Sequence, residues 1–432
     1  MTTVKLNDPS AFELVSGLWK SDRLPLTKGR VLRSTNFNGD GLLDFSDVVE
    51  LEVEERHAAK RQLKDGDIII ERSGGGPKQP VGRVAFFKAP DEQAYFSSNF
   101  TTTLRIRDQK LLDPEFVSLY LHALYLNGDT ETLQRATTGI RNLDWQEYLN
   151  FEIPKFDSQS QRSIRQLISK VRQTYQCEQS LLMLLGELKQ QVMKQLFTCG
   201  LSEEKLKDTE IGLVPSSWDV VQLGAFCTLS TGTTPATKNK SYYVGNIPFI
   251  KTGDVVNNRI TSANTFLSNE AVADYGLKLF PTGTILMAMY GQGKTRGQVA
   301  LLSIEATTTQ NAAAIQPSGE IDSAFLWHYL RSCYERLRGM GSLGHVSHLN
   351  LGYLRDLLII KPPLKEQREI AKILDVIDRK IAVHQTKKSV LDELFRSLLN
   401  KLMTGELSVN DLDLSALSPD ETQPQTETEV QL

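Results

Sequence analysis

Residues 288–295 are the stretch of this chain that comes nearest to a catalytic motif. They read Ala-Met-Tyr-Gly-Gln-Gly-Lys-Thr, the loose form of a phosphate-binding loop, and they follow an apolar run that predicts a strand. Such a loop needs a helix that begins at its Lys-Thr pair, because the free amides and the dipole of that helix hold the phosphates. Here Thr295 is followed by Arg-Gly-Gln-Val-Ala-Leu-Leu, which predicts another strand. A nucleotide-dependent enzyme is therefore the less favoured alternative, testable by nucleotide binding to Lys294→Ala.

The other reactive side chains are too scattered to predict a catalytic or metal site. His345 and His348 lie three residues apart, but no third ligand is apparent. The four cysteines include no Cys-x-x-Cys pair, which argues against zinc and fits a reducing cytosol. Neither a Gly-x-Ser-x-Gly motif nor the Asn-Pro-Pro-Tyr type of methyltransferase signature occurs. The sequence thus predicts a cytoplasmic protein with no catalytic residue, metal or cofactor of its own.

Polar and basic side chains gather instead in loops that follow short apolar runs, at corresponding places in the two halves of the chain. Their hydrogen-bonding groups are of the kind that reach phosphate oxygens and base edges. Any one of these loops could equally be a solvated turn, but their recurrence favours a binding surface. The candidate nucleic-acid contacts are Arg33, Ser34, Asn36, Arg72, Ser73, Lys78, Arg83, Arg141, Asn142, Lys251, Thr252, Tyr290, Gln292, Lys294, Arg296, His345, Ser347 and His348.

A long internal repeat decides which elements must position these loops. Residues 153–201 match residues 359–407 without a gap, and twelve of the 49 aligned positions are identical. A repeat at a fixed offset has to be interpreted first, because it sets the architecture. This period is too long for a solenoid, so it predicts two half-molecules.

Both copies of the repeat predict a long helix. Pro154 in the first copy, and Pro362 with Pro363 in the second, suit the entry to a helix. Seam residues then follow at alternating spacings of three and four, as in a coiled coil, with two polar intrusions per copy. We expect the two helices to pack antiparallel about a pseudo-twofold axis. The residues expected in the packing are Val171, Leu182, Leu185, Val192, Leu196, Ile377, Ile381, Leu391, Leu398 and Leu402.

The remaining sequence predicts an α+β domain used twice. Residues 1–152 and 206–358 each contain strand, Gly-rich loop and returning strand, followed by a short helix. The predicted spacer helices occupy 153–205 and 359–408, and an acidic tail predicted to be disordered occupies 409–432.

The amino-acid composition indicates only the broad class of protein. With 40% apolar and 23% charged residues and a net charge of −3, the chain is typical of an ordinary soluble protein. No apolar run is long enough for a membrane helix, and the N-terminus has no signal-peptide pattern. Charge balance alone does not point to nucleic acid.

The chain resembles the specificity subunits of Type I restriction–modification systems. The resemblance covers essentially the whole chain, in the order variable domain, helical spacer, variable domain, helical spacer. Its specific motifs are the paired Gln-Arg dipeptides at 161–162 and 367–368, the ending Leu-Met-Thr-Gly-Glu-Leu at 402–407, and the entry Ile-Gly-Leu-Val-Pro-Ser-Ser-Trp at 211–218. The first domain departs from the pattern, because it lacks such an entry and its ending at 197–201 is degenerate.

The resemblance implies a non-catalytic protein that reads a bipartite sequence in double-stranded DNA. Each target-recognition domain would read one half-site, and the helix pair would dock two adenine methyltransferase subunits. Those subunits would carry S-adenosylmethionine, and restriction subunits would complete the enzyme, so that Mg²⁺ and ATP are also expected on partners. A coiled-coil scaffold with two protein-binding domains is the alternative, distinguishable by the steep salt dependence of DNA binding.

Overall fold

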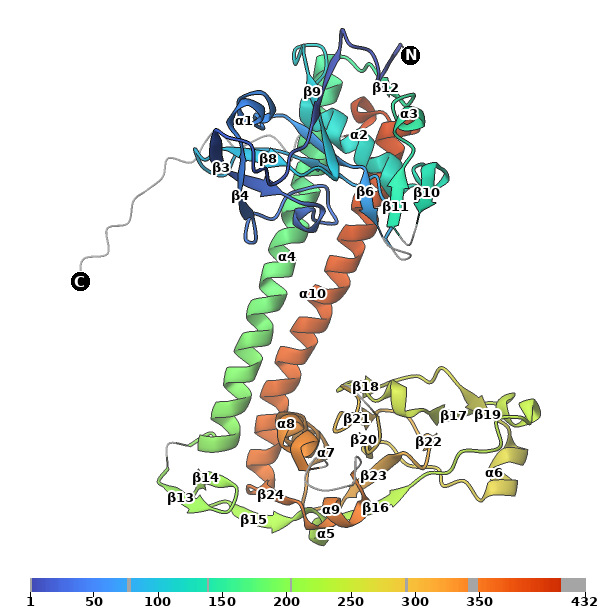
Figure 1. Cartoon of the computed structure of the whole chain (residues 1–432). Helices are drawn as coiled ribbons and strands as arrows, with labels where there is room; N and C mark the ends of the chain where they lie inside the picture. Colours follow the sequence, from blue (N-terminus) through green and yellow to red (C-terminus); the bar gives the residue numbers. More distant parts are fainter. Residues whose placement is uncertain are drawn as a thin grey trace. The chain divides into compact units, whose positions relative to one another are not determined.

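The computed structural model describes residues 2–75, 79–137, 140–202, 204–291, 294–340 and 349–412. The chain forms two compact units (Figure 1). Unit 1 contains residues 1–180 and 386–432, and unit 2 contains residues 181–385. Both unit boundaries fall inside long helices, α4 (Ser158–Cys199) and α10 (Leu364–Thr404), so each helix contributes one part to each unit.

Unit 1 is built from short sheets around the helix α2. Its largest sheet has the order β2-β9-β5-β7, all antiparallel, and a second sheet has the order β4-β3-β8 with β3 and β8 parallel. Two smaller sheets pair β1 with β12 and order β10-β11-β6. The elements are β1 (Thr3–Lys5), β2 (Phe12–Ser16), β3 (Leu26–Leu32), η1 (Ser34–Asn36), β4 (Val49–Glu54), α1 (Glu55–Arg61), β5 (Ile68–Glu71), β6 (Ser73–Gly75), β7 (Val84–Phe86), β8 (Tyr95–Ser97), β9 (Thr101–Ile106), α2 (Pro114–Leu126), η2 (Glu131–Leu133), β10 (Gln134–Thr137), β11 (Ile140–Leu143), α3 (Trp145–Tyr148), β12 (Glu152–Pro154) and η5 (Val409–Asp411).

Unit 2 repeats this strand order. Its largest sheet is β16-β23-β20-β21-β18, whose first four strands are antiparallel, and β19-β17-β22 has β17 and β22 parallel. The elements are β13 (Leu206–Thr209), β14 (Gly212–Pro215), β15 (Asp219–Gln222), α5 (Leu223–Phe226), β16 (Cys227–Thr231), η3 (Lys240–Tyr243), β17 (Ile247–Ile250), η4 (Thr252–Asp254), β18 (Arg259–Ile260), β19 (Phe266–Leu267), α6 (Asn269–Tyr275), β20 (Ile285–Ala288), β21 (Val299–Leu302), β22 (Thr307–Thr308), β23 (Ala312–Pro317), α7 (Ser323–Ser332), α8 (Tyr334–Met340), α9 (Leu351–Asp356) and β24 (Leu358–Lys361).

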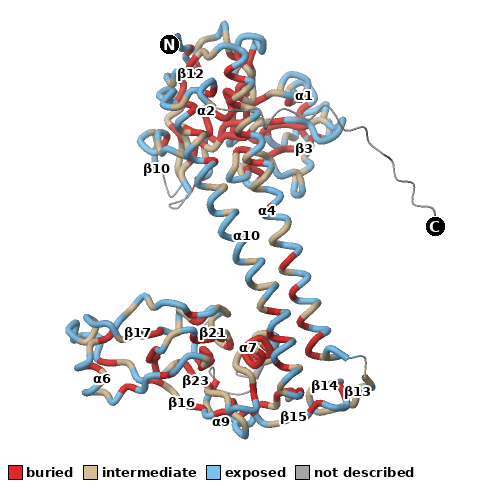
Figure 2. The backbone as a smooth tube through the Cα atoms, turned by 180° about the vertical axis from the view of Figure 1, so that it is seen from behind, coloured by how far each residue is buried: buried red, intermediate tan, exposed pale blue. Residues whose placement is uncertain are grey.

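The cores explain why these segments are strands and helices. The run Ile68, Ile69 and Ile70 is buried on both faces of β5, as expected for a central strand with apolar neighbours on each side. In unit 2, Phe325 and Leu326 of α7 are fully buried beneath the sheet in the largest apolar cluster. Figure 2 shows the same pattern, with buried residues concentrated in the strands and in α2 and α7.

The two long helices bury one stripe each. All ten residues expected in the packing are buried or half-buried, whereas neighbours such as Leu184 and Val383 are exposed. Within unit 1 the partners run in opposite directions: Arg172 lies over the ring of Phe395 at 5.5 Å, and Glu178 forms an ion pair with Lys387. The charge of Glu178, one of the polar residues in the seam, is therefore neutralised by Lys387 of the facing helix.

The glutamine of the first Gln-Arg pair fastens α4 to its own domain. Gln161 is 1% exposed and makes three hydrogen bonds to main chain. Its Oε1 accepts from the Asp113 amide at 2.8 Å, and its Nε2 donates to the carbonyls of Leu111 (3.0 Å) and Phe156 (2.7 Å). Asp113 is also the N-cap of α2, so the bond joins the starts of two helices.

Gln367 makes the same three bonds in unit 2. It is 0% exposed; its Oε1 accepts from the Asp322 amide at 2.8 Å, and its Nε2 donates to the carbonyls of Glu320 (3.1 Å) and Pro362 (2.8 Å). Asp322 caps α7 as Asp113 caps α2. The sequence motif is therefore a main-chain clamp, which pattern matching alone did not reveal.

Three expectations about boundaries need correction. Pro154 ends the strand β12, and α4 begins only at Ser158, where Asp157 accepts hydrogen bonds from the next amides. The spacer helices are thus shorter at both ends than 153–205 and 359–408. The tail expected to be disordered from residue 409 begins with a 3₁₀ turn whose Val409 is 5% exposed in the core of unit 1. Residues 413–432 lie outside the described residues.

The α+β class predicted from the sequence is confirmed at that level. Among the described residues, no helix has the length and apolar character required to cross a membrane.

Candidate nucleic-acid interface

Two of the predicted polar loops of unit 1 come together in one small sheet. Strand β6 pairs with β11, which places Ser73 opposite Asn142 and Gly75 opposite Arg141. The Ser73 hydroxyl donates to Asn142 Oδ1 at 2.5 Å, and the Leu143 amide donates to the carbonyl of Arg72 at 2.8 Å. Segments about 70 residues apart in the sequence therefore form one polar surface.

The guanidinium of Arg72 lies over an aromatic ring. Its guanidinium carbon lies 4.8 Å from the centre of the Trp145 ring, which itself stacks on Tyr148 at 5.5 Å. Nη1 of Arg72 donates to the Thr102 hydroxyl at 3.4 Å, and the residue is exposed. Partial burial lowers the pKa of Arg72, yet an arginine stays charged at neutral pH. Stacking leaves its hydrogen-bonding edge available for a ligand.

Arg83, by contrast, is committed inside unit 1. Its Nε and Nη2 donate to the two carboxylate oxygens of Glu71 at 2.9 and 2.8 Å, and Nη2 also donates to the carbonyl of Ser34 at 2.9 Å. Glu71 is 1% exposed, and the guanidinium lies 5.5 Å from the ring of Phe37. Burial alone would lower the pKa of Arg83, but Glu71 raises it on balance. The expectation that Arg83 contacts nucleic acid finds no support in this geometry.

The loop at residues 33–36 is held together by the buried Asn36, and its other polar residues lie nearer the surface. Asn36 is 2% exposed; its Oδ1 accepts from the Arg33 amide at 2.9 Å, and its Nδ2 donates to the carbonyls of Asp44 and Asp47. Arg33 forms an ion pair with Asp47 at 3.1 Å, and Ser34 is half-buried. Asn36 therefore shapes the loop and does not face a ligand.

Unit 2 builds the matching loop with different residues. The Lys251 amide donates to Asp254 Oδ2 at 2.9 Å, as the Arg33 amide does to Asn36, and each closes a 3₁₀ turn. The Thr252 hydroxyl lies 3.2 Å from that of Thr309, and Lys251 itself is exposed. The recurrence predicted for these two loops thus extends to their backbone geometry.

The second polar loop of unit 2 follows β20. The Leu349 amide donates to the carbonyl of Met289 at 3.0 Å, the counterpart of the bond between Leu143 and Arg72 in unit 1. Tyr290 is 41% exposed and Lys294 is exposed, while Arg296 Nη2 donates to the carbonyl of Arg338 at 3.1 Å. Five predicted contacts lie outside the described residues: Lys78, Gln292, His345, Ser347 and His348.

The phosphate-loop alternative loses its structural basis. After Lys294 and Thr295 the chain enters the strand β21 (Val299–Leu302), as the sequence predicted, so the helix that would hold phosphates is not there. Within the described parts of the chain, no group of three or more His, Cys, Asp or Glu residues is arranged to hold a metal ion.

Sequence reasoning missed Trp145 and Glu71, the two residues that decide what the arginines of this surface can do. Trp145 follows the helix cap Asp144, a weak signal for a turn that presents a ring. Glu71 ends a strand of isoleucines, and an acid at the end of a buried strand is a signal for a buried partner.

Each unit thus combines an α+β fold with polar loops, and the exposed basic residues of these loops include Arg72, Lys251 and Lys294. Residues 215–393 match the family described as the Type I restriction modification DNA specificity domain. The MjaVIII specificity subunit of a Type I restriction enzyme from Methanocaldococcus jannaschii is 27% identical over 314 residues, covering 69% of this chain and 71% of the relative. The MjaIX specificity subunit of the same organism is 29% identical over 204 residues, covering 45% of this chain and 46% of the relative.

A solved structure shares the fold. The S subunit of a Type I restriction–modification system from M. genitalium aligns with a TM-score of 0.59 at 18% identity, covering 93% of this chain and 95% of that one. The resemblance to Type I specificity subunits predicted from the sequence is confirmed, and residues 215–393 match the DNA specificity domain of this family.

Proposed function

We propose that this chain is the DNA-reading subunit of a Type I restriction–modification complex, with one duplicated domain for each half of a bipartite target. The observation that carries the proposal is the repeated presentation of basic loops after equivalent strands. Unit 1 offers Arg72 beside β5, and unit 2 offers Lys294 and Arg296 between β20 and β21. The common strand order of the two units supports a duplication.

The proposed division of labour leaves all catalysis to other chains. Two adenine methyltransferase subunits with S-adenosylmethionine would flip and methylate the target base, and restriction subunits with Mg²⁺ and ATP would cut, all in the cytoplasm. The docking surface would be the outward stripe of the long helices. Exposed apolar residues occur there at heptad spacing, among them Val376 (49%) and Val383 (64%) on α10 and Leu184 (57%) and Leu188 (51%) on α4.

In the antiparallel coiled-coil arrangement proposed for the spacers, the two half-sites would lie about one helical turn apart, roughly 34–36 Å. Within unit 1 the pairing of Arg172 with Phe395 and of Glu178 with Lys387 supports the antiparallel direction. The paired glutamine clamps of Gln161 and Gln367 would keep each domain fixed to its helix.

The test is DNA binding by the chain assembled with its methyltransferase. Probes carry the methylation target, or the target altered in one half-site at a time. Arg72→Ala should lose about 1–3 kcal/mol and relax discrimination in one half-site if Arg72 reads a base, whereas Arg296→Ala should act in the other. A pure phosphate contact would weaken binding to every probe and lower the salt slope by about one.

Arg162→Ala is the matched control, because Arg162 is an exposed arginine on α4 and is not among the predicted DNA contacts. If Arg72→Ala and Arg296→Ala change the same half-site, or if neither differs from Arg162→Ala, the proposal of one domain per half-site is wrong. DNA binding that does not depend on salt would favour the protein-scaffold alternative.

A further inference from the structure

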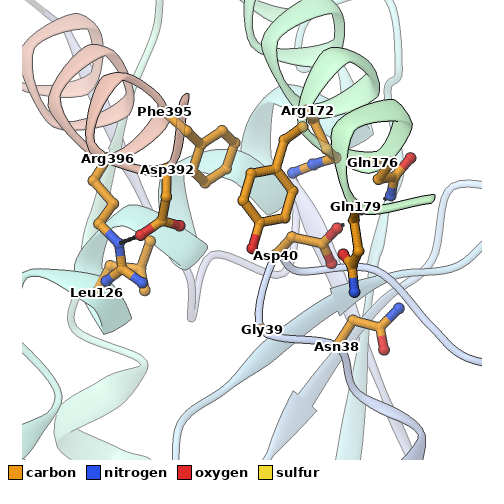
Figure 3. Close-up of a pocket in the computed structure, with 11 residues that line it drawn as sticks. Asn38, Gly39, Asp40, Leu126, Arg172, Gln176, Gln179, Asp392, Phe395 and Arg396 are labelled. Carbon is orange, nitrogen blue, oxygen red and sulfur yellow. Dashed lines mark hydrogen bonds and ion pairs between the residues drawn. The ribbon is translucent and has the colours of Figure 1, made fainter. Parts of the chain in front are cut away.

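A cavity of about 370 Å³ opens in unit 1, partly lined by residues that directly follow the loop at 33–36 (Figure 3). Residues 38–40, the end of α2 at Leu126, α4 and α10 form its walls. The volume lies in the range of small-molecule sites, roughly 300–1,000 Å³. Neither the proposed DNA contacts nor the apolar stripe of the helices accounts for it.

Arg172 of α4 is the unusual member of this wall. It is 7% exposed, yet within the described residues its guanidinium has no acidic partner at ion-pair distance, and its Nε has no hydrogen-bond partner. Its guanidinium carbon lies 5.5 Å from the centre of the Phe395 ring. Burial lowers the pKa of Arg172, and the more distant Asp40 and Glu115 act in the opposite direction. A buried cation without a hydrogen-bonded counter-ion is costly, so such sites ordinarily pair with an anion.

The other polar groups of the wall are already engaged or are neutral. Arg396 Nε donates to Asp392 Oδ2 at 3.0 Å, and Gln176 Nε2 donates to Asp40 Oδ2 at 3.2 Å. In Figure 3 the amides of Asn38 and Gln179 lie near Asp40. Among the residues that the structure describes, the cavity therefore offers the Arg172 guanidinium without an ion-pair partner, together with carboxylate and amide acceptors for donor groups.

Unit 2 shows that the fold does not require an unpaired charge at this point. The residue that aligns with Arg172 in the repeat is Asp378, which accepts from Arg331 Nη1 at 2.7 Å and forms an ion pair with Lys189. The charge at the repeated position is satisfied by protein groups in one unit and is left open to a cavity in the other.

We infer that the cavity is a binding site for a small carboxylic acid that also carries hydroxyl or amino groups. Its carboxylate would take the place of the missing partner of Arg172, and its donors would face Asp40 and the amides. A monoanion fits better than a phosphate, because Asp40 and Asp392 line the same space and repel a second negative charge.

The experiment observes Arg172 directly in the full chain. Protein labelled with ¹⁵N-arginine is titrated with sodium glycolate, with sodium chloride at equal ionic strength, and with inorganic phosphate, and the Nε–H resonances are followed. The Arg172 signal is assigned by its loss in Arg172→Lys, which keeps the positive charge at this position. We expect a saturable glycolate-dependent shift of this signal, absent with chloride and weaker with phosphate.

Arg162→Lys serves as the control, since it must leave the Arg172 titration unchanged. Asp40→Asn, which keeps an acceptor, should alter glycolate affinity by a few-fold, and Arg172→Lys should weaken it about tenfold or more as judged from glycolate-dependent thermal stabilisation. An Arg172 signal that does not saturate, or that responds equally to chloride or more strongly to phosphate, overturns the inference. Because no DNA or partner subunit is present, this outcome is independent of the proposed function.

Discussion

Replacing Gln367 by Met should destabilise unit 2 far more than an ordinary substitution does. Methionine keeps the length of the side chain but removes all three hydrogen bonds, leaving the Asp322 amide and the carbonyls of Glu320 and Pro362 without their partner. A buried group left unsatisfied costs about 1–3 kcal/mol. Because water can reach some of the freed groups, we expect a loss of about 3 kcal/mol for the three together.

The measurement is urea and thermal unfolding of the full chain, with hydrogen exchange at the first turn of α7 to localise the effect. A loss of this size should lower the melting temperature of a unit of about 200 residues by roughly 6–12 °C. Gln161→Met should act in the same way on α2 of unit 1. Arg368→Met is the control, since Arg368 is exposed beside Gln367 and should stay within about 0.5 kcal/mol. If Gln367→Met matches this control, the clamp does not stabilise the unit.

Three further outcomes are expected. Glu71→Gln should cost about 3 kcal/mol in urea unfolding, because it leaves the largely buried Arg83 without its carboxylate; an unchanged midpoint would show that the pair is replaceable. Arg172→Met should raise stability by about 1–2 kcal/mol in ligand-free buffer, since it removes a buried charge that has no ion pair among the described residues; destabilisation would mean that the charge is satisfied inside the unit. The exposed thiols of Cys177 and Cys199 should react with a disulfide reagent in the native protein. Burial raises the pKa of Cys227 to about 12 and also raises the pKa of Cys333, so these two buried thiols should react only after unfolding.

The long helices were predictable because their signal is local. A seam at spacings of three and four needs no knowledge of distant residues, and its polar members were visible as exceptions. The sequence could not show which residue pairs with each polar member of the seam. Glu178 pairs with Lys387, and the two lie on different helices more than 200 residues apart. Only the packed register of the helices brings them together.

The candidate interface shows the same limit at the level of single residues. Arg72 and Arg83 flank one Gly-rich loop and carry the same functional group, so composition gave both the same expectation. The strand pairing of β5 with β7 then places Glu71 beside Arg83, while the turn at Trp145 brings a ring under Arg72. One arginine becomes part of the core and the other stays available to a ligand. Register, which a loop sequence does not encode, decides between these outcomes.

The contacts that recur in both units are made to main chain. Gln161 and Gln367 bind backbone groups, and Gly17 and Gly232 each come so close to a facing carbonyl that an added Cβ would lie 1.8 Å from its oxygen.

One group of contacts that differs between the units is made between side chains. In unit 2, Arg259 and His328 hold Asp375 at 2.6 and 2.9 Å; burial would raise the pKa of that carboxyl, but these partners lower it to about 2. Three residues further along the repeat, the place of Asp378 in unit 2 is taken in unit 1 by Arg172, which lines the cavity. A scaffold fastened through its backbone tolerates exchange of the side chains around it. This property would suit the proposed DNA-reading function, because the loops could then change without loss of the fold.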